Sequence, residues 1–119
     1  MLGLKRGTVK LVKHSPKWRQ SFLREEKKIR EIFGKNAVVV EHIGSTAIPG
    51  MSAKPVIDIA LAVPSLQKAR QYEKKLKEIG YNIKSGDGRK ERLFFTKGPE
   101  NKRTHYLHIG EIGSDYIED

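Results

Sequence analysis

The stretch EHIGSTAIPGMSAKPVIDIALAV, residues 41–63, decides how this chain folds and where its chemistry lies. A run rich in β-branched residues breaks at Gly44-Ser45 into a loop of small residues and prolines, and then resumes as an apolar strand that contains Asp58. Because successive side chains of a strand alternate between its two faces, the bulky residues after Val56 share one face, and Asp58 lies on the other beside alanines. The pattern predicts a strand that is buried on one side and presents a carboxylate on the other.

The segments around this stretch predict an α+β domain. Ser15 is typical of a helix N-cap, Pro16 of a first helical position and Gly34 of a helix end. A second helix is expected from Ser65 to about Gly80. The remaining apolar runs predict strands, and turns are expected around 86–88 and 98–99; the strands cover residues 37–43, 56–63, 81–84, 92–96 and 104–109. We expect a mixed sheet with the helices mainly on one face, in one domain over residues 1–119.

Composition limits the classes of function. The 119 residues are 37% hydrophobic and 32% charged, and no apolar run is long enough for a membrane span, so we expect a cytoplasmic protein without a membrane partner. The absence of cysteine excludes disulfides and thiolate metal sites. The net charge of +10 suggests an anionic partner, RNA included, although exposed helix faces that need polar residues explain the helix lysines better.

The loop and the aspartate together suggest phosphate chemistry. A Gly-Ser pair that leaves a strand exposes backbone N–H groups, and a short helix after it would present its N-terminus to a phosphate. Asp58 on the following strand would face that phosphate, and the two repel each other unless a divalent cation such as Mg²⁺ or Mn²⁺ joins them. The alternative is that Asp58 pairs with a basic side chain such as Lys54 or Arg92, or caps the loop backbone. The spacing alone leaves both interpretations open.

Three motifs carry a family resemblance. Gly44-Ser45 followed by Asp58 on an apolar strand resembles the signature of the DNA polymerase beta-like nucleotidyltransferase superfamily. More closely, VEHIGSTAIPGMSAKPVIDI resembles the central motif of the GrpB family, a small group in that superfamily. VKLVKHSPKWRQSF before it and RLFFTKGPENKRTHYLHI after it resemble the family's flanking blocks, so the resemblance covers residues 9–109. It implies a nucleotidyltransferase-like fold, a nucleotide phosphate at Gly44, Ser45 and Thr46, and a metal at Asp58.

The chain departs from this pattern in two ways. The superfamily's second carboxylate is expected two residues after Asp58, where this sequence has Ala60; Glu41 is a candidate second metal ligand if its strand turns it inward. Family members also usually continue into further helices, whereas this chain ends in GEIGSDYIED. We expect a domain without those helices, and the apolar surface they would cover makes a homo-oligomer an expectation.

Further polar residues complete the candidate site. Alternation in the last strand sends Tyr106 and His108 to one face, and we expect His108 near the pocket and Arg103 on the phosphate. Arg92 and Lys54 are candidate phosphate contacts. The histidine could instead be a partly buried strand residue with satisfied ring nitrogens. The functions considered are metal-dependent nucleotidyl transfer with Asp58, Arg103 and His108 as catalytic residues, a catalytically impaired module that binds a nucleotide or cofactor, and RNA binding. Some family members are fused to dephospho-coenzyme A kinase, which implies a coenzyme A connection by resemblance.

Overall fold

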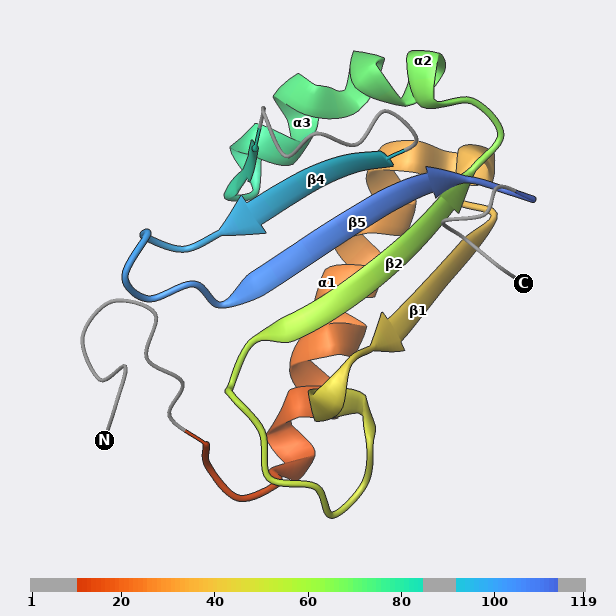
Figure 1. Cartoon of the computed structure of the whole chain (residues 1–119). Coiled ribbons are helices and arrows are strands. Elements are labelled where there is room, and N and C mark those ends of the chain that lie inside the picture. Colours follow the sequence, from red (N-terminus) through yellow and green to blue (C-terminus); the bar gives the residue numbers. More distant parts are fainter. Residues whose placement is uncertain (1–10, 85–91, 114–119) are drawn as a thin grey trace.

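The helix expected after Ser15 forms in the computed structural model, which describes residues 11–84 and 92–113 (Figure 1). Helix α1 spans Pro16–Phe33, and the Ser15 hydroxyl accepts a hydrogen bond from the Lys17 N–H at 3.1 Å. Gly34 ends it with a φ of 57°. The buried side of α1 carries aromatic and aliphatic residues at helical spacing, namely Trp18, Phe22, Ile29 and Phe33. The helix ends and the apolar stripe were both predictable from the sequence.

Five strands of the described residues form one mixed sheet in the order β1-β2-β5-β4-β3. The pair β2 and β5 is parallel, and the other three pairs are antiparallel. The strands are β1 (Val39–Ile43), β2 (Ile57–Val63), β3 (Tyr81–Ile83), β4 (Arg92–Lys97) and β5 (His105–Glu111). The last strand thus lies between β2 and β4, which brings its side chains next to those of the Asp58 strand.

The helices cover one face of this sheet. Helix α1 crosses behind β2 and β5 in Figure 1, and the helical segment that follows β2 lies on the side of β3 and β4. One core cluster joins buried residues of α1, such as Ile29, to buried residues of the strands, such as Ile59 and Leu107. The α+β class with helices on one face is confirmed. The other face, which carries Asp58, is covered by no helix of the described residues.

One local prediction was wrong. The helix expected as one element over 65–80 is divided into α2 (Leu66–Ala69), a 3₁₀ turn at Arg70–Tyr72 and α3 (Glu73–Glu78). The tighter turn ends at Tyr72, whose ring packs on Phe33 with centroids 4.5 Å apart and whose hydroxyl accepts a hydrogen bond from Asn36 at 3.0 Å. Before α1, Val12 forms an isolated antiparallel bridge with Ala53. Tertiary contacts at Tyr72 override the local helical pattern.

Two further expectations concern segments that the structure does not describe. The turn predicted at 86–88, and the acidic tail beyond residue 113, lie outside the described residues. Within 11–84 and 92–113, no helix combines the length and the apolar character that crossing a bilayer requires.

Candidate functional site

Gly44 and Asp58 are in direct contact, which explains why the loop needs glycine. A Cβ placed on Gly44 would lie 2.8 Å from Asp58 Oδ2 and 3.2 Å from its Cβ. The backbone there has φ 78° and ψ −173°, a conformation that is essentially restricted to glycine. Gly44 therefore makes room for the Asp58 carboxylate.

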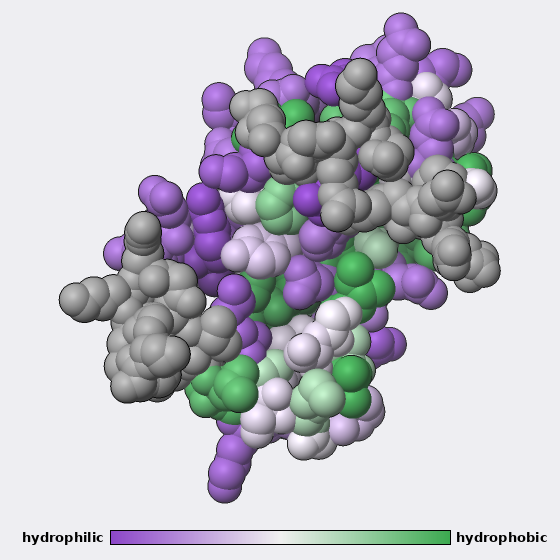
Figure 2. Space-filling model, viewed as in Figure 1, coloured by the Kyte–Doolittle hydropathy of each residue, from purple (hydrophilic) through white to green (hydrophobic). Residues whose placement is uncertain are grey.

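The loop and the start of β2 enclose a small cavity. Its volume is about 130 Å³, and it is lined by Ser45, Thr46, Lys54, Val56 and Asp58. After Gly44 the chain forms a three-residue 3₁₀ turn, Ser45–Ala47, so the short helix considered from the sequence is a single turn. A hydroxyl, an ammonium group and a carboxylate from two segments thus border one space. Figure 2 shows hydrophobic residues at this lower end of the molecule, where Ile48 and Met51 of the same loop are exposed.

Asp58 is held by a chain of hydrogen bonds across the sheet. Its Oδ1 lies 3.3 Å from His108 Nε2, and His108 Nδ1 lies 2.8 Å from a guanidinium nitrogen of Arg92. An arginine side chain can only donate, so Nδ1 of His108 must be the acceptor, and the proton of the neutral ring is on Nε2. His108 therefore donates to Asp58. The predicted residues Arg92, His108 and Asp58 are brought together on the sheet face that no described helix covers. We call it the open face.

Aromatic rings extend this face beyond Asp58. Phe94 lies 5.5 Å from Tyr106 and 5.0 Å from His108, measured between ring centroids. The Arg92 guanidinium lies 4.6 Å from the centre of the Phe94 ring, and the Lys54 ammonium 5.6 Å from that of Tyr106. Each distance is within the range of cation–π attraction. The rings on β4 and β5 and their two cations form what we call the aromatic strip: Arg92, Phe94, Tyr106, His108 and Lys54.

Other candidate residues lie elsewhere or are otherwise engaged. Arg103 donates to the Gly98 carbonyl oxygen at 2.7 Å, across the turn between β4 and β5. Thr46 is 2% exposed, and its hydroxyl lies 3.5 Å from the Val56 carbonyl and 2.9 Å from His42 Nε2. Thr46 lines the cavity while it also joins the two ends of the loop. The roles assigned to these residues from the sequence stay predictions.

Glu41 shares the open face with Asp58. It is opposite Ala60 in the β1–β2 register, whereas Ile43 is opposite Asp58. Paired residues of neighbouring strands project to the same side, so Glu41 faces the way that the metal prediction required. Its position is nevertheless diagonal to Asp58, about 7–8 Å away between Cα atoms in such pairs.

The donors around Asp58 do not fit a preformed metal site. No three His, Asp or Glu side chains of residues 11–84 and 92–113 converge as a metal site requires. His108 presents an N–H to Asp58, not a lone pair to a cation. Mg²⁺ and Mn²⁺ prefer several oxygen ligands, and Ala60 offers none. The metal prediction for Asp58 and Glu41 stays a prediction that this donor set does not favour.

Comparison with known proteins assigns the chain to a family. The model of the GrpB family, described as GrpB protein, matches residues 8–119. The chain belongs to the GrpB family. It is 38% identical over 110 residues to UPF0157 protein YqkA of Bacillus subtilis, a match that covers 92% of this chain and 32% of YqkA. The chain therefore spans about a third of the length of that relative.

A solved structure agrees with this assignment, and part of the chain is also similar to a segment of a larger protein. The crystal structure of the conserved protein GrpB from Enterococcus faecalis superposes with a TM-score of 0.81 at 34% identity, covering 86% of this chain and 61% of that one. A dephospho-CoA kinase of Mycolicibacterium paratuberculosis is 38% identical over 79 residues, which are 64% of this chain and 19% of the kinase. The family membership of the chain and its fold are thus shown by independent comparisons.

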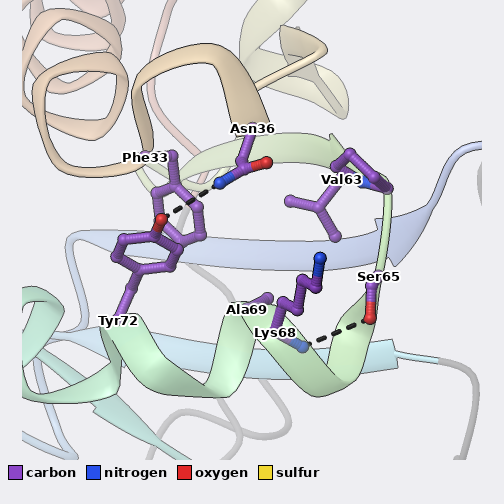
Figure 3. A pocket seen from close by; sticks show the side chains of 8 residues that line it. Phe33, Asn36, Val63, Ser65, Lys68, Ala69 and Tyr72 are labelled. Atoms are coloured by element: carbon purple, nitrogen blue, oxygen red, sulfur yellow. Dashed lines mark hydrogen bonds between the residues drawn. The ribbon is translucent and has the colours of Figure 1, made fainter.

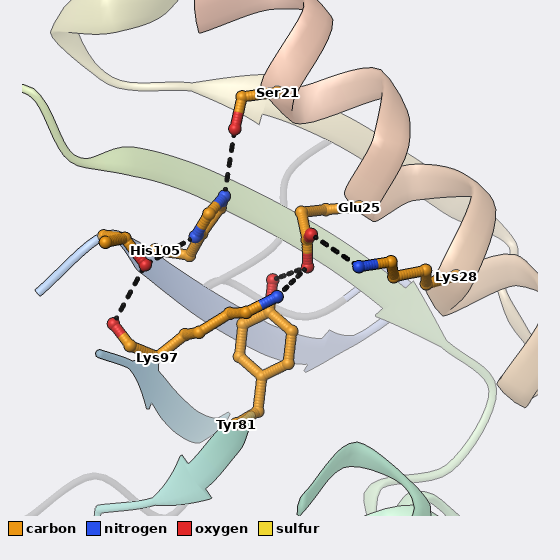
Figure 4. Close-up of polar contacts among 7 residues, drawn as sticks. Ser21, Glu25, Lys28, Tyr81, Lys97 and His105 are labelled. Atoms are coloured by element: carbon orange, nitrogen blue, oxygen red, sulfur yellow. Dashed lines mark hydrogen bonds and ion pairs between the residues drawn. The ribbon is translucent and has the colours of Figure 1, made fainter. Parts of the chain in front are cut away.

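Within this GrpB-family fold, sequence reasoning missed a buried polar cluster between α1 and the sheet (Figure 4). Glu25 is 5% exposed and accepts hydrogen bonds from the Tyr81 hydroxyl at 2.8 Å and from Lys97 at 3.0 Å. Burial alone would raise the pKa of Glu25, but the bonds from Lys97 and Tyr81 outweigh it and hold the pKa below its usual value. Glu25 lies between Phe22 and Ile29 on the apolar stripe of α1, and a charged residue in such a stripe was the signal that could have revealed it.

Two histidines on the helix-covered side are held neutral. His105 contacts the Ser21 hydroxyl at 3.2 Å and the Thr104 hydroxyl at 2.8 Å. Burial lowers the pKa of His105, and Lys97 contributes in the same direction although Glu25 opposes it. Burial also lowers the pKa of His42, whose ring stacks on a phenylalanine of α1. These histidines serve packing, in contrast to His108 on the open face.

A larger cavity lies at the other end of β2 (Figure 3). It measures about 230 Å³ and is lined mainly by apolar side chains, with Lys68 at its border. The predicted site residues are absent from its lining. We place the candidate site at the smaller cavity because a cation, a hydroxyl and a carboxylate converge there, and convergent polar groups define a specific site better than volume does.

Proposed function

We propose that this chain binds a nucleotide or another phosphorylated small molecule in the cavity between the loop and β2. The observation that carries the proposal is that Ser45 and Lys54 of the loop and Asp58 of β2 line one cavity. Lys54 supplies a positive charge for a phosphate, Ser45 a hydroxyl donor, and Asp58 an acceptor for a ligand donor. The side chains are of the kinds that recognise a phosphate attached to a polar body.

The aromatic strip favours a nucleotide within that class. Tyr106 is opposite Asp58 in the parallel β2–β5 register, so its ring is adjacent to the cavity. The Lys54 ammonium lies over this ring and also borders the cavity, which links the phosphate end of the site to a surface for a base. A base stacked on an aromatic side chain gains about 1–3 kcal/mol, whereas an exposed cation–π contact gains about 0.5–1 kcal/mol. A base can therefore displace Lys54 from the ring and leave the ammonium to the phosphate.

Binding is proposed here in preference to nucleotidyl transfer. A two-metal transfer mechanism needs anionic ligands for each ion, and the position two residues after Asp58 is Ala60. Glu41 is diagonal to Asp58 and exposed to solvent. Any Mg²⁺ or Mn²⁺ at this site would depend mainly on oxygens of the ligand, because the chain supplies few oxygen ligands of its own. The catalytically impaired binding module is the form of the function that these residues support.

Thermal denaturation tests the proposal. The panel contains ATP, the other nucleoside triphosphates, dephospho-coenzyme A and ribose 5-phosphate, each with EDTA, Mg²⁺ or Mn²⁺; dephospho-coenzyme A is included because of the kinase similarity. A ligand at 100 times its Kd stabilises the fold by about 2.7 kcal/mol. We expect a shift for at least one ligand that is lost in Lys54→Ala and kept in Lys68→Ala, a matched lysine at the other cavity. Absence of a shift across the panel would refute the proposal.

Single-stranded RNA is a second candidate because the aromatic strip lies on an open sheet face. Proteins that bind single strands combine aromatic rings for bases with cations for phosphates, and Phe94 and Tyr106 with Arg92 and Lys54 provide both. Binding of a short oligonucleotide that is unaffected by Asp58→Ala but falls steeply with salt would favour this candidate over the small-molecule one.

A further inference from the structure

We propose that Asp58 acts in this site as the acceptor for a hydroxyl group of the ligand, positioned by Arg92 through His108, and that the phosphorylated ligand binds without a divalent metal. This inference rests on the proposed function and deepens it. It names the ligand as a phosphate joined to a hydroxylated body, such as the ribose phosphate of a ribonucleotide.

The Asp58 carboxylate keeps acceptor positions for a ligand. An ionised carboxylate offers about four acceptor positions on its two oxygens. His108 Nε2 uses one of them on Oδ1, and Oδ2 packs against Gly44. The carboxylate also borders the cavity, and its side chain is 28% exposed. Further acceptor positions therefore face the ligand.

The ligand group at Asp58 is a hydrogen-bond donor. Phosphate oxygens are acceptors and repel a carboxylate, so the ligand group at Asp58 must be a donor. Lys54 and Ser45 border the same cavity and provide the donors that a phosphate needs. A cavity of about 130 Å³ brings the two ligand groups close together. A sugar phosphate carries a hydroxyl donor within a few bonds of its phosphate, which matches this division.

Arg92 and His108 position the Asp58 carboxylate. The Arg92 guanidinium lies over the Phe94 ring and donates a hydrogen bond to His108 Nδ1, because a guanidinium group cannot accept one. The proton of the neutral His108 ring is therefore on Nε2, which donates to Asp58. The His108 ring in turn rests on Phe94 at a centroid distance of 5.0 Å. His108 is therefore a positioning residue that holds Asp58 by hydrogen bonding. A cation at Asp58 Oδ1 would have to displace this N–H, and the nearby Arg92 and Lys54 charges oppose it.

The decisive experiment measures Mn²⁺ binding to the full chain by the loss of its free paramagnetic resonance signal, with no other ligand present. If His108 keeps Asp58 occupied as a donor, wild type binds Mn²⁺ no better than Asp58→Ala. His108→Leu removes the donor and should tighten Mn²⁺ binding about tenfold, the size expected for one hydrogen bond to a charged group. His108→Gln, whose amide can donate, should stay like wild type, and circular dichroism confirms that each variant is folded.

Opposite results overturn the inference. If wild type binds Mn²⁺ tightly and His108→Leu loses it, His108 is a metal ligand; if neither binds Mn²⁺, the histidine is not what excludes the cation. The ligand hydroxyl is tested by titrating ATP and dideoxyadenosine triphosphate by calorimetry in EDTA. The inference predicts that ATP binds in EDTA and that the dideoxy analogue binds about tenfold more weakly, with equal weakening of ATP in Asp58→Ala. Equal affinity for ATP and the dideoxy analogue, or binding only with Mg²⁺, refutes the inference and leaves the proposed phosphate binding intact. If no ligand of the phosphate panel binds, the proposed function is refuted. The Mn²⁺ comparison still decides the role of His108 in that case.

Discussion

Replacing Gly44 by alanine should destabilise the fold through two separable effects. A non-glycine residue at φ 78° and ψ −173° costs about 1–3 kcal/mol of backbone strain. The new Cβ would also lie 2.8 Å from Asp58 Oδ2, a distance that forces the carboxylate to move. Movement of Asp58 breaks its bond with His108, and a hydrogen bond to a charged group contributes about 1.5–3 kcal/mol. The total expected loss is about 2.5–6 kcal/mol.

Gly50 provides the matched control in the same loop. Its φ is 79°, and a Cβ there would meet nothing within 4 Å. Gly50→Ala should therefore show strain only, and Gly44→Ala should be more destabilising by about 1.5–3 kcal/mol in urea unfolding at pH 7. In the double variant Gly44→Ala with Asp58→Ala the clash partner is shortened, so the two changes should cost less together than the sum of their separate costs. Equal losses for Gly44→Ala and Gly50→Ala, or simple additivity in the double variant, would refute the contact as the reason for glycine.

The remaining predictions concern the metal, the buried cluster and acid stability. Ala60→Asp adds a carboxylate between Glu41 and His108 on the open face, and it should tighten Mn²⁺ binding measured by paramagnetic resonance; unchanged binding would mean that this face does not hold a metal even with the added carboxylate. Tyr81→Phe removes a buried donor from Glu25 and should cost about 1.5–3 kcal/mol in urea unfolding, whereas Tyr72→Phe, at a partly exposed hydroxyl, should cost less than about 1.5 kcal/mol; equal losses would contradict the importance of the Glu25 cluster. Because the pKa of His105 is lowered by burial, the unfolded chain takes up its proton first, so stability should fall as pH drops below 6.5, and His105→Gln should flatten this slope between pH 7.5 and 5.5; a parallel slope in the variant would count against a neutral buried His105. The lowered pKa of Glu25 adds a second loss as pH falls from 4.5 through the folded-state pKa, which Glu25→Gln should remove in acid titrations followed by circular dichroism.

Much of the fold follows from short-range signals in the sequence. Ser15 and Gly34 bound α1 because a cap needs a hydroxyl and a helix end tolerates glycine. Alternation placed Ile59 in the core and Asp58 on the open face, since a strand has only two faces. These predictions depend on neighbours within a few residues, and the structure agrees with them.

The rest depends on contacts that local patterns do not encode. Alternation placed His108 on the face of Asp58, but only the insertion of β5 beside β2 brings its ring within 3.3 Å of the carboxylate. The contact between Gly44 and Asp58 also joins positions 14 residues apart along the chain, as their numbers show, through a loop whose path the sequence did not specify. The partners of Glu25 could not be read from the sequence, because Tyr81 and Lys97 become its neighbours only after the sheet has formed.

The most direct test of the central claim is a titration of the ¹⁵N-labelled chain with ATP, followed by amide chemical shifts. If the cavity binds the phosphorylated ligand, the largest shifts should fall on Ser45, Thr46, Lys54 and Asp58, with smaller ones on β5 around Tyr106. The residues around the larger cavity, such as Ala69, should stay unchanged. Shifts concentrated there, or none in the loop at saturating ATP or any other ligand of the panel, would contradict the assignment of the site to this loop.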